Sequence, residues 1–98
     1  MILMCTEYFL NEEGRSYFPH WLRHVVEKLQ EQPGFLGIRQ LKDATSGDGC
    51  RLLLEFETQE LLQRWLASEE HTEALSLLEP FTLKPFSSTQ YYAEHITV

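Results

Sequence analysis

One histidine of this chain stands where its side chain could move a proton. His71 follows Ser68 in a segment with helical apolar spacing, and an unperturbed imidazole has a pKa of about 6.5. It could therefore donate a hydrogen bond to a ligand oxyanion or take the proton of a ligand hydroxyl. The alternative is structural, with His71 closing a break in the helix. Trp65 could wall a flat aromatic ligand by stacking, or serve as a core aromatic, because it lies on the apolar stripe.

Three tyrosines could add phenolic hydrogen-bond donors to such a pocket. Tyr8, Tyr91 and Tyr92 lie in strand-forming segments, so ordinary strand packing explains them equally well. We expect Tyr8 and Tyr91 to line a ligand pocket between sheet and helices. Phe35 is the third expected pocket residue, and it could instead fill that space.

Other reactive residue types lack a partner motif. His20 and His24 are four residues apart, but Trp21 stands where a zinc metalloprotease motif requires Glu, so we expect a solvated helix face. The two cysteines, Cys5 and Cys50, form no CxxC pair and are expected to be buried, inert thiols. The sequence also contains no nucleotide-binding or nucleophile-elbow motif. We therefore predict no metal and no cofactor.

Composition bounds the class of protein. The 98 residues predict one domain spanning residues 1–98, and 43% of them are hydrophobic. A formal net charge of -7 repels phosphate backbones and anionic lipid, so we expect neither a nucleic-acid nor a membrane partner. The first residues are too short an apolar run for a signal peptide. We accordingly expect a cytoplasmic protein.

The first half of the chain predicts a strand, a helix and a hairpin. Residues 1–10 read as a strand largely buried on both faces. Residues 15–32 show helical spacing, with Ser16 as N-cap and Pro19 in the first turn. Strands over 35–41 and 50–57 flank a turn and should pair.

The second half predicts a broken helix and a last strand. Apolar residues over 59–78 form two stripes that are out of phase by roughly half a turn at about 100° per residue. We therefore predict a break near residues 67–70, with Ser68 as a fresh N-cap. Residues 81–87 read as an extended connection, and residues 89–98 as the fourth strand.

The resulting order, β-α-β-β-α-β, is the ferredoxin-like α+β plan with a four-stranded antiparallel sheet. Two helices cover only one face of such a sheet. The strands carry more apolar surface than one face can use, so we expect a second copy to pack sheet against sheet. The protein should be a homodimer.

Three segments carry a resemblance to a known family. Residues 33–37 (Pro-Gly-Phe-Leu-Gly), 52–56 (Leu-Leu-Leu-Glu-Phe) and 65–71 (Trp-Leu-Ala-Ser-Glu-Glu-His) resemble the antibiotic biosynthesis monooxygenase (ABM) family in order and spacing. The resemblance covers residues 1–95. It implies a dimeric α+β barrel whose enzymatic members oxidise polycyclic phenols, anthrones or quinols with molecular oxygen, often without metal or flavin.

The sequence leaves three functional hypotheses open. The first is a cofactor-independent monooxygenase of a small aromatic, quinol-like substrate, with His71 and Trp65 as catalytic residues. The second is a non-catalytic dimeric domain that binds a ligand or serves in stress. The third is a haem-degrading member of the same superfamily. The haem-ligating position of those proteins falls on Leu75 and their strand-one Asn falls near Glu7, so haem degradation is the least expected.

Overall fold

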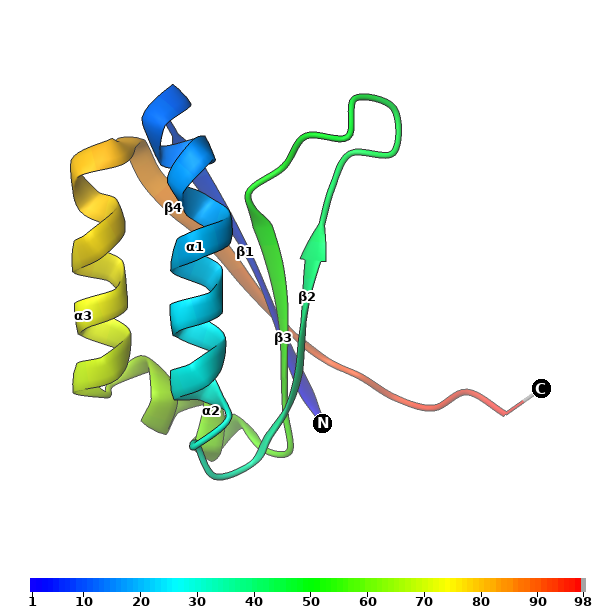
Figure 1. The fold of residues 1–98 in the computed structure, drawn as a ribbon. Coiled ribbons are helices and arrows are strands. Elements are labelled where there is room, and N and C mark those ends of the chain that lie inside the picture. Colours follow the sequence, from blue (N-terminus) through cyan, green and yellow to red (C-terminus); the bar gives the residue numbers. More distant parts are fainter. Residues whose placement is uncertain (98) are drawn as a thin grey trace.

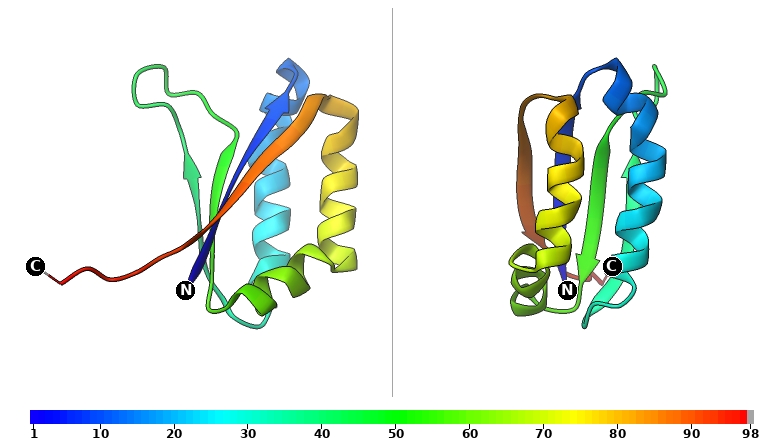
Figure 2. Two further views of the ribbon diagram at one scale, coloured as in Figure 1. Left: turned by 180° about the vertical axis from the view of Figure 1, so that it is seen from behind. Right: turned by 60° about the vertical axis from the view of Figure 1, so that its left-hand side comes forward.

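A computed structural model describes residues 1–97 as a four-stranded antiparallel sheet with helices on one face (Figures 1 and 2). The strand order is β2-β3-β1-β4, which confirms the ferredoxin-like plan. The elements in chain order are β1 Ile2–Leu10, α1 Glu12–Leu29, β2 Phe35–Leu41, β3 Arg51–Phe56, α2 Gln59–Leu66, α3 Glu69–Leu78, the 3-10 turn η1 Glu79–Phe81 and β4 Thr82–Tyr92.

The central strand β1 alternates between the two faces of the sheet. Ile2, Met4 and Thr6 are buried toward the helices, whereas Leu3 and Cys5 between them remain partly exposed. The prediction that β1 is buried on both faces is therefore wrong for this chain by itself. The predicted hairpin is confirmed, because β2 and β3 pair antiparallel.

Helix α1 begins earlier than the sequence predicted. Asn11, not Ser16, is the N-cap, and its side-chain oxygen accepts a hydrogen bond of 2.8 Å from the Gly14 amide. Gly14 lies in the first turn, where a Cβ would lie 2.6 Å from the Phe81 Cβ, so the glycine permits close packing. Pro19 consequently stands in the helix interior, on its exposed side, where water can reach the carbonyl that loses its partner.

The predicted break in the second helical segment is confirmed. Helix α2 ends at Leu66 and α3 begins at Glu69, with Ser68 as the N-cap between them. The break lets both apolar stripes face inward: Leu62 and Trp65 are buried on α2, and Ala74 and Leu78 on α3. A straight helix would have exposed one pair to water.

The last strand is the second element that the sequence placed wrongly. Strand β4 runs over Thr82–Tyr92, through the segment predicted to be a connection, and residues 93–97 are not strand. Pro85 is tolerated because β4 is an edge strand whose pairing with β1 shifts register between Phe9 and Glu7. Val98 lies outside the described residues.

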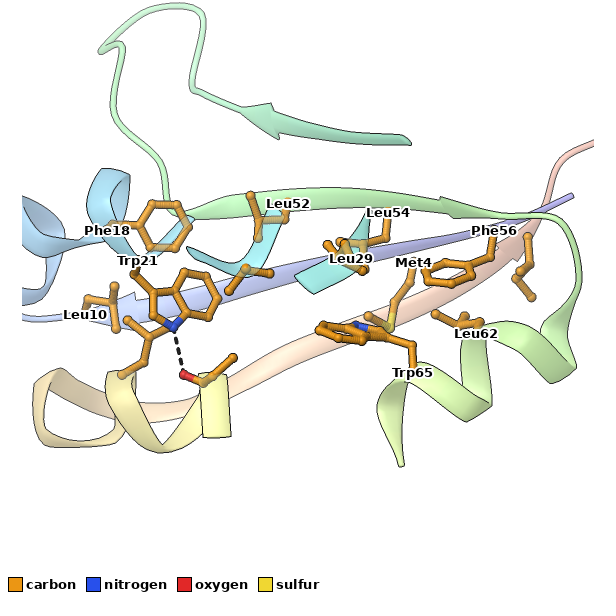
Figure 3. Close-up of a cluster of buried hydrophobic side chains, with 14 residues drawn as sticks. Met4, Leu10, Phe18, Trp21, Leu29, Leu52, Leu54, Phe56, Leu62 and Trp65 are labelled. Atoms are coloured by element: carbon orange, nitrogen blue, oxygen red, sulfur yellow. Dashed lines mark hydrogen bonds between the residues drawn. The ribbon is translucent and has the colours of Figure 1, made fainter. Parts of the chain in front are cut away.

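The core fills the layer between the sheet and the helices (Figure 3). Its largest fully buried side chains are Trp21, Trp65, Phe18 and Phe56. The Trp21 indole donates a hydrogen bond of 2.7 Å to the Ala74 carbonyl, shown dashed in Figure 3, and so ties α1 to α3. Among residues 1–97, no helix combines the length and the apolar character that crossing a membrane requires.

Candidate active site

An open groove runs between α3 and β4 and consists of two adjoining hollows. The larger has a volume of about 640 Å³ and the smaller about 360 Å³. Both are lined by the same four residues, which come from β1, α2, α3 and β4: Tyr8, Leu66, His71 and Phe86. The sequence predicted a pocket between sheet and helices, and the groove lies there.

The groove exists because the helices do not cover the edge strand. Every residue of β4 is exposed, whereas β1 beside it and β3 beyond β1 contribute buried residues to the core. The larger hollow is lined mainly by Leu66, Leu75, Leu78, Pro85 and Phe86, and the smaller one also by the polar side chains of Thr6, Ser88 and Gln90. An apolar channel with a few polar groups on its floor is typical of sites for small organic ligands.

His71 is held by the helix break. Its backbone amide donates to the Ser68 hydroxyl at 3.2 Å, and its Nδ1 lies 3.0 Å from the Leu66 carbonyl oxygen. A carbonyl can only accept, so Nδ1 carries the proton in this contact. The neutral ring therefore keeps Nε2 as an unprotonated acceptor. This arrangement fits a proton acceptor better than a donor to an existing oxyanion.

The protonation state of His71 follows from its surroundings. Burial lowers the pKa of the imidazole from its ordinary value of 6.5, and the hydrogen bond to Leu66 opposes this only in part. The side chain is therefore neutral at pH 7. A neutral imidazole with one free nitrogen is the form that a general base requires.

Trp65 lies behind His71 rather than in the groove. Its side chain is 2% exposed, and its ring meets the His71 ring edge to face at a centroid distance of 5.3 Å. The indole thus fixes the plane of the imidazole from the core side. Both rings also border a small interior void of about 20 Å³, which is far too small for a ligand.

Tyr8 enters the groove from the sheet. Its ring packs against Phe18, Trp21 and Phe86 at centroid distances of 6.0, 5.4 and 5.7 Å. Burial raises the pKa of its hydroxyl, so the phenol stays protonated. Tyr8 and His71, two of the expected site residues, thus both line the groove.

The other two expected pocket residues do not line the groove. Phe35 packs edge to face on Phe56 at a centroid distance of 5.8 Å, and it borders neither hollow. Tyr91 pairs with Leu3, on the face of the sheet that the helices leave bare, and is 53% exposed. Its neighbour Tyr92 points to the helix side instead, where its hydroxyl donates to Gln59 at 2.6 Å.

The sequence reasoning missed the contribution of β4. Phe86, Ser88 and Gln90 line the groove, although Phe86 was predicted in a connection, Ser88 was left unassigned, and Gln90 was expected only as a residue of the fourth strand. They alternate with exposed residues of the other face, and this period-two pattern was the available signal. Pro85 concealed it, because proline argues against a regular strand.

A larger hollow of about 900 Å³ lies elsewhere, where the loop after β2 meets β1 and β4. Its lining mixes Arg15, Arg51 and Lys84 with acidic side chains and the half-buried Cys50. Burial raises the pKa of the Cys50 thiol, which keeps it in the unreactive protonated form. This hollow holds no proton acceptor comparable to His71, so we place the candidate site in the α3–β4 groove.

Residues 1–97 contain no cluster of three or more His, Cys, Asp or Glu side chains that could hold a metal ion. Among the described groove-lining residues, Tyr8, His71 and Glu79 are of types that can ligate iron. Leu75, where the sequence analysis expected the haem-ligating position, lines the groove with a hydrocarbon side chain.

The two helix caps provide a test of how His71 is held. Ser68→Ala should lower the free energy of unfolding by about 0.5–2 kcal/mol, as loss of an N-cap does. It should also shift the His71 ring resonances in an NMR spectrum, because Ser68 binds the His71 amide. Thr58→Ala removes the equivalent cap of α2 and is the matched control, with a similar loss of stability. Unchanged His71 resonances in Ser68→Ala would show that the cap does not position the ring.

Comparison with protein families decides the relationship of the chain. The family model for antibiotic biosynthesis monooxygenases matches residues 1–76. The chain belongs to the antibiotic biosynthesis monooxygenase family. The match covers β1, α1, the β2–β3 hairpin, α2 and most of α3, including His71. No curated protein matches the sequence significantly.

Solved structures share the fold of this chain, and some of them are described as antibiotic biosynthesis monooxygenases. A conserved protein from Methanosarcina mazei Go1 has a TM-score of 0.83 at 15% identity, covering 95% of this chain and 92% of its own. SnoaB, a cofactor-independent oxygenase from Streptomyces nogalater, has a TM-score of 0.81 at 12% identity, covering 97% and 94%. Rv0793 from Mycobacterium tuberculosis has a TM-score of 0.79 at 12% identity, covering 99% and 98%. At these identities the likeness establishes the fold alone.

Proposed function

We propose that this ABM-family chain is a cofactor-independent monooxygenase of a small, neutral aromatic substrate of the phenol or quinol type. One observation carries the proposal: a neutral imidazole with a free Nε2 lines an open, largely apolar groove. Glu79 alone among the described groove-lining residues is charged, so the groove favours an uncharged ligand. An open groove also argues against the non-catalytic alternative in which side chains fill the pocket.

His71 would start the reaction as the base. Its Nε2 accepts a proton from the substrate, and the resulting imidazolium remains hydrogen bonded through Nδ1 to Leu66. Deprotonation turns the substrate into an electron-rich anion in surroundings of low polarity. Trp65 acts as a positioning residue, because it holds the imidazole without reaching the groove.

The substrate anion then supplies the electrons for oxygen. One electron passes to O2, the two radicals combine at a ring carbon, and a hydroperoxide forms with the returned proton. Loss of water leaves a carbonyl at that ring carbon, which is a CH2 group in the keto tautomer of the phenol. The net change is CH2 + O2 → C=O + H2O, in which the substrate provides all four electrons and no other reductant is consumed.

We further propose that the functional form is a homodimer joined through the bare face of the sheet. Leu3, Cys5 and Leu53 are half-buried on that face and Tyr91 is exposed there, so they form an apolar strip across β4, β1 and β3. Two ion pairs, Glu7–Arg51 at 2.8 Å and Arg39–Glu55 at 3.5 Å, lie on the same face. A second copy packed sheet to sheet would remove the strip from water.

Labelled oxygen tests the proposed reaction. A panel of anthrones and naphthoquinols is incubated with purified protein under 18O2, with a chelator present and no added reductant. We expect one labelled oxygen atom in the product, and one molecule of O2 consumed for each molecule of substrate. If the protein accelerates the oxidation of no substrate in the panel above the protein-free rate, the proposed reaction is wrong.

A further inference from the structure

The hydroxyl of Tyr8 is a hydrogen-bond donor without a partner in the chain. Three aromatic rings surround the Tyr8 ring and fix its direction, and the residue lines both hollows of the groove. Within residues 1–97 no side chain or carbonyl accepts from this hydroxyl, and no fully buried polar side-chain atom is left unpaired. The hydroxyl therefore opens to the groove, where its partner must come from outside the chain.

The surroundings restrict what this hydroxyl can do. Burial raises the pKa of the phenol, so it remains protonated over the whole ordinary pH range and never carries a charge. The rings that pack on Tyr8 are those of Phe18, Trp21 and Phe86, and they offer no acceptor in place of water when a ligand enters. A ligand that brings an acceptor oxygen to this point is favoured over one that does not.

The Thr6–Ser88 pair strengthens this assignment. The two hydroxyls on the floor of the smaller hollow hydrogen bond to each other at 3.3 Å. His71 uses its one ring N–H on the Leu66 carbonyl. One of these two hydroxyls and the His71 Nδ1–H thus use their protons within the chain, whereas the Tyr8 hydroxyl has no acceptor among the described residues.

We infer that Tyr8 is a specificity-determining residue of the groove, a fixed donor that binds a carbonyl oxygen on the ring system of the ligand. The inference deepens the proposed function, since it names the feature that distinguishes a ligand from a plain hydrocarbon of the same shape. The same hydrogen bond would strengthen once His71 has removed a proton and charge has moved onto that oxygen.

Binding of a matched pair of probes tests this role without any turnover. 1-Tetralone and tetralin share a bicyclic frame and differ in one carbonyl group. Tyr8→Phe keeps the ring and removes only the hydroxyl, so it should raise the Kd for 1-tetralone about 3- to 10-fold, as loss of one neutral hydrogen bond does. The Kd for tetralin should not change, which also shows that the variant is folded. Titration calorimetry or NMR shift titration measures both constants.

Tyr17→Phe is the matched control, because Tyr17 lies on α1, packs against Phe81 and lines neither hollow. It should leave both constants unchanged. An equal loss of affinity for both probes in Tyr8→Phe would mean that Tyr8 acts by packing alone, and it would overturn the inference. An unchanged Kd for 1-tetralone in this variant would also overturn it, as would the absence of 1-tetralone binding to the wild-type protein. Tyr8-dependent binding of 1-tetralone without 18O incorporation from any substrate would overturn the proposed reaction and leave the inference standing.

Discussion

His71→Gln lowers kcat/KM for quinol oxidation by about 10²- to 10⁴-fold, the usual contribution of a general base. Glutamine retains an amide that can donate to the Leu66 carbonyl, but it cannot take a proton from the substrate. Substrate affinity should change little, because the groove walls remain. Steady-state oxygen uptake measures kcat and KM separately, and thermal unfolding confirms that the variant is folded.

His20→Gln serves as the control for this experiment. His20 is exposed on α1 and lines neither hollow of the groove, so its replacement should leave kcat/KM within experimental error. A wild-type rate in His71→Gln would remove the proposed base from the reaction. The groove would then have to act on a substrate that is already deprotonated in solution.

The pH dependence gives the same prediction a second, independent measurement. Because burial lowers the pKa of His71 below 6.5, the imidazole is a free base at neutral pH and becomes protonated only as the pH falls through that lowered value. The acidic limb of the kcat/KM profile should therefore lie below pH 6.5 and should disappear in His71→Gln. An acidic limb that stays in the variant would have to belong to another group.

Leu53→Glu should convert the dimer to a monomer. Leu53 lies opposite Cys5 in the middle of the bare face, and a two-fold interface would bury the new carboxylate twice. Two unpaired charges on desolvated sheet surface cost several kcal/mol, which corresponds to a rise of about 10²-fold or more in the dimer dissociation constant. Sedimentation velocity over a concentration series measures this constant.

Leu77→Glu is the matched control for the interface. Leu77 is 42% exposed on the outer side of α3, so the same change in size and charge should leave the dimer intact. If Leu53→Glu and the wild-type chain both sediment as folded monomers in dilute solution, the bare face is not an interface between copies. If both sediment as dimers, copies associate through another surface.

Local patterns were sufficient for most of the fold. The phase difference between Leu62 and Ala74 demanded a break, and Ser68 lies where that break needs a cap. The start of α1 was missed because Gly14 resembles a breaker, and only its contact with Phe81, far away in the sequence, explains a buried glycine in a first turn. Such a contact between distant segments leaves no periodic signal in the sequence.

The site was only partly predictable for the same reason. Tyr8 and His71 belong to regular elements whose inner faces can be derived from apolar spacing. Tyr91 and Tyr92 are neighbours that point to opposite faces of β4, so a pairing shift of one residue exchanges them. The register of β4 depends on the irregularity near Pro85 and Phe9, which composition does not reveal.

The uneven distribution of charge bears on which form of a weak acid reaches the groove. The chain carries a formal charge of -7, while Glu79 is the one acidic or basic residue among the described residues that line the groove. Long-range repulsion lowers the local concentration of anions in the medium, but it leaves uncharged solutes unaffected. Phenolates that form spontaneously in solution are thus repelled by the negatively charged protein, and the substrate loses its proton only after it has bound in the groove. Uptake of a neutral acid should accordingly be insensitive to ionic strength, whereas the escape of an anion should be accelerated in dilute buffer.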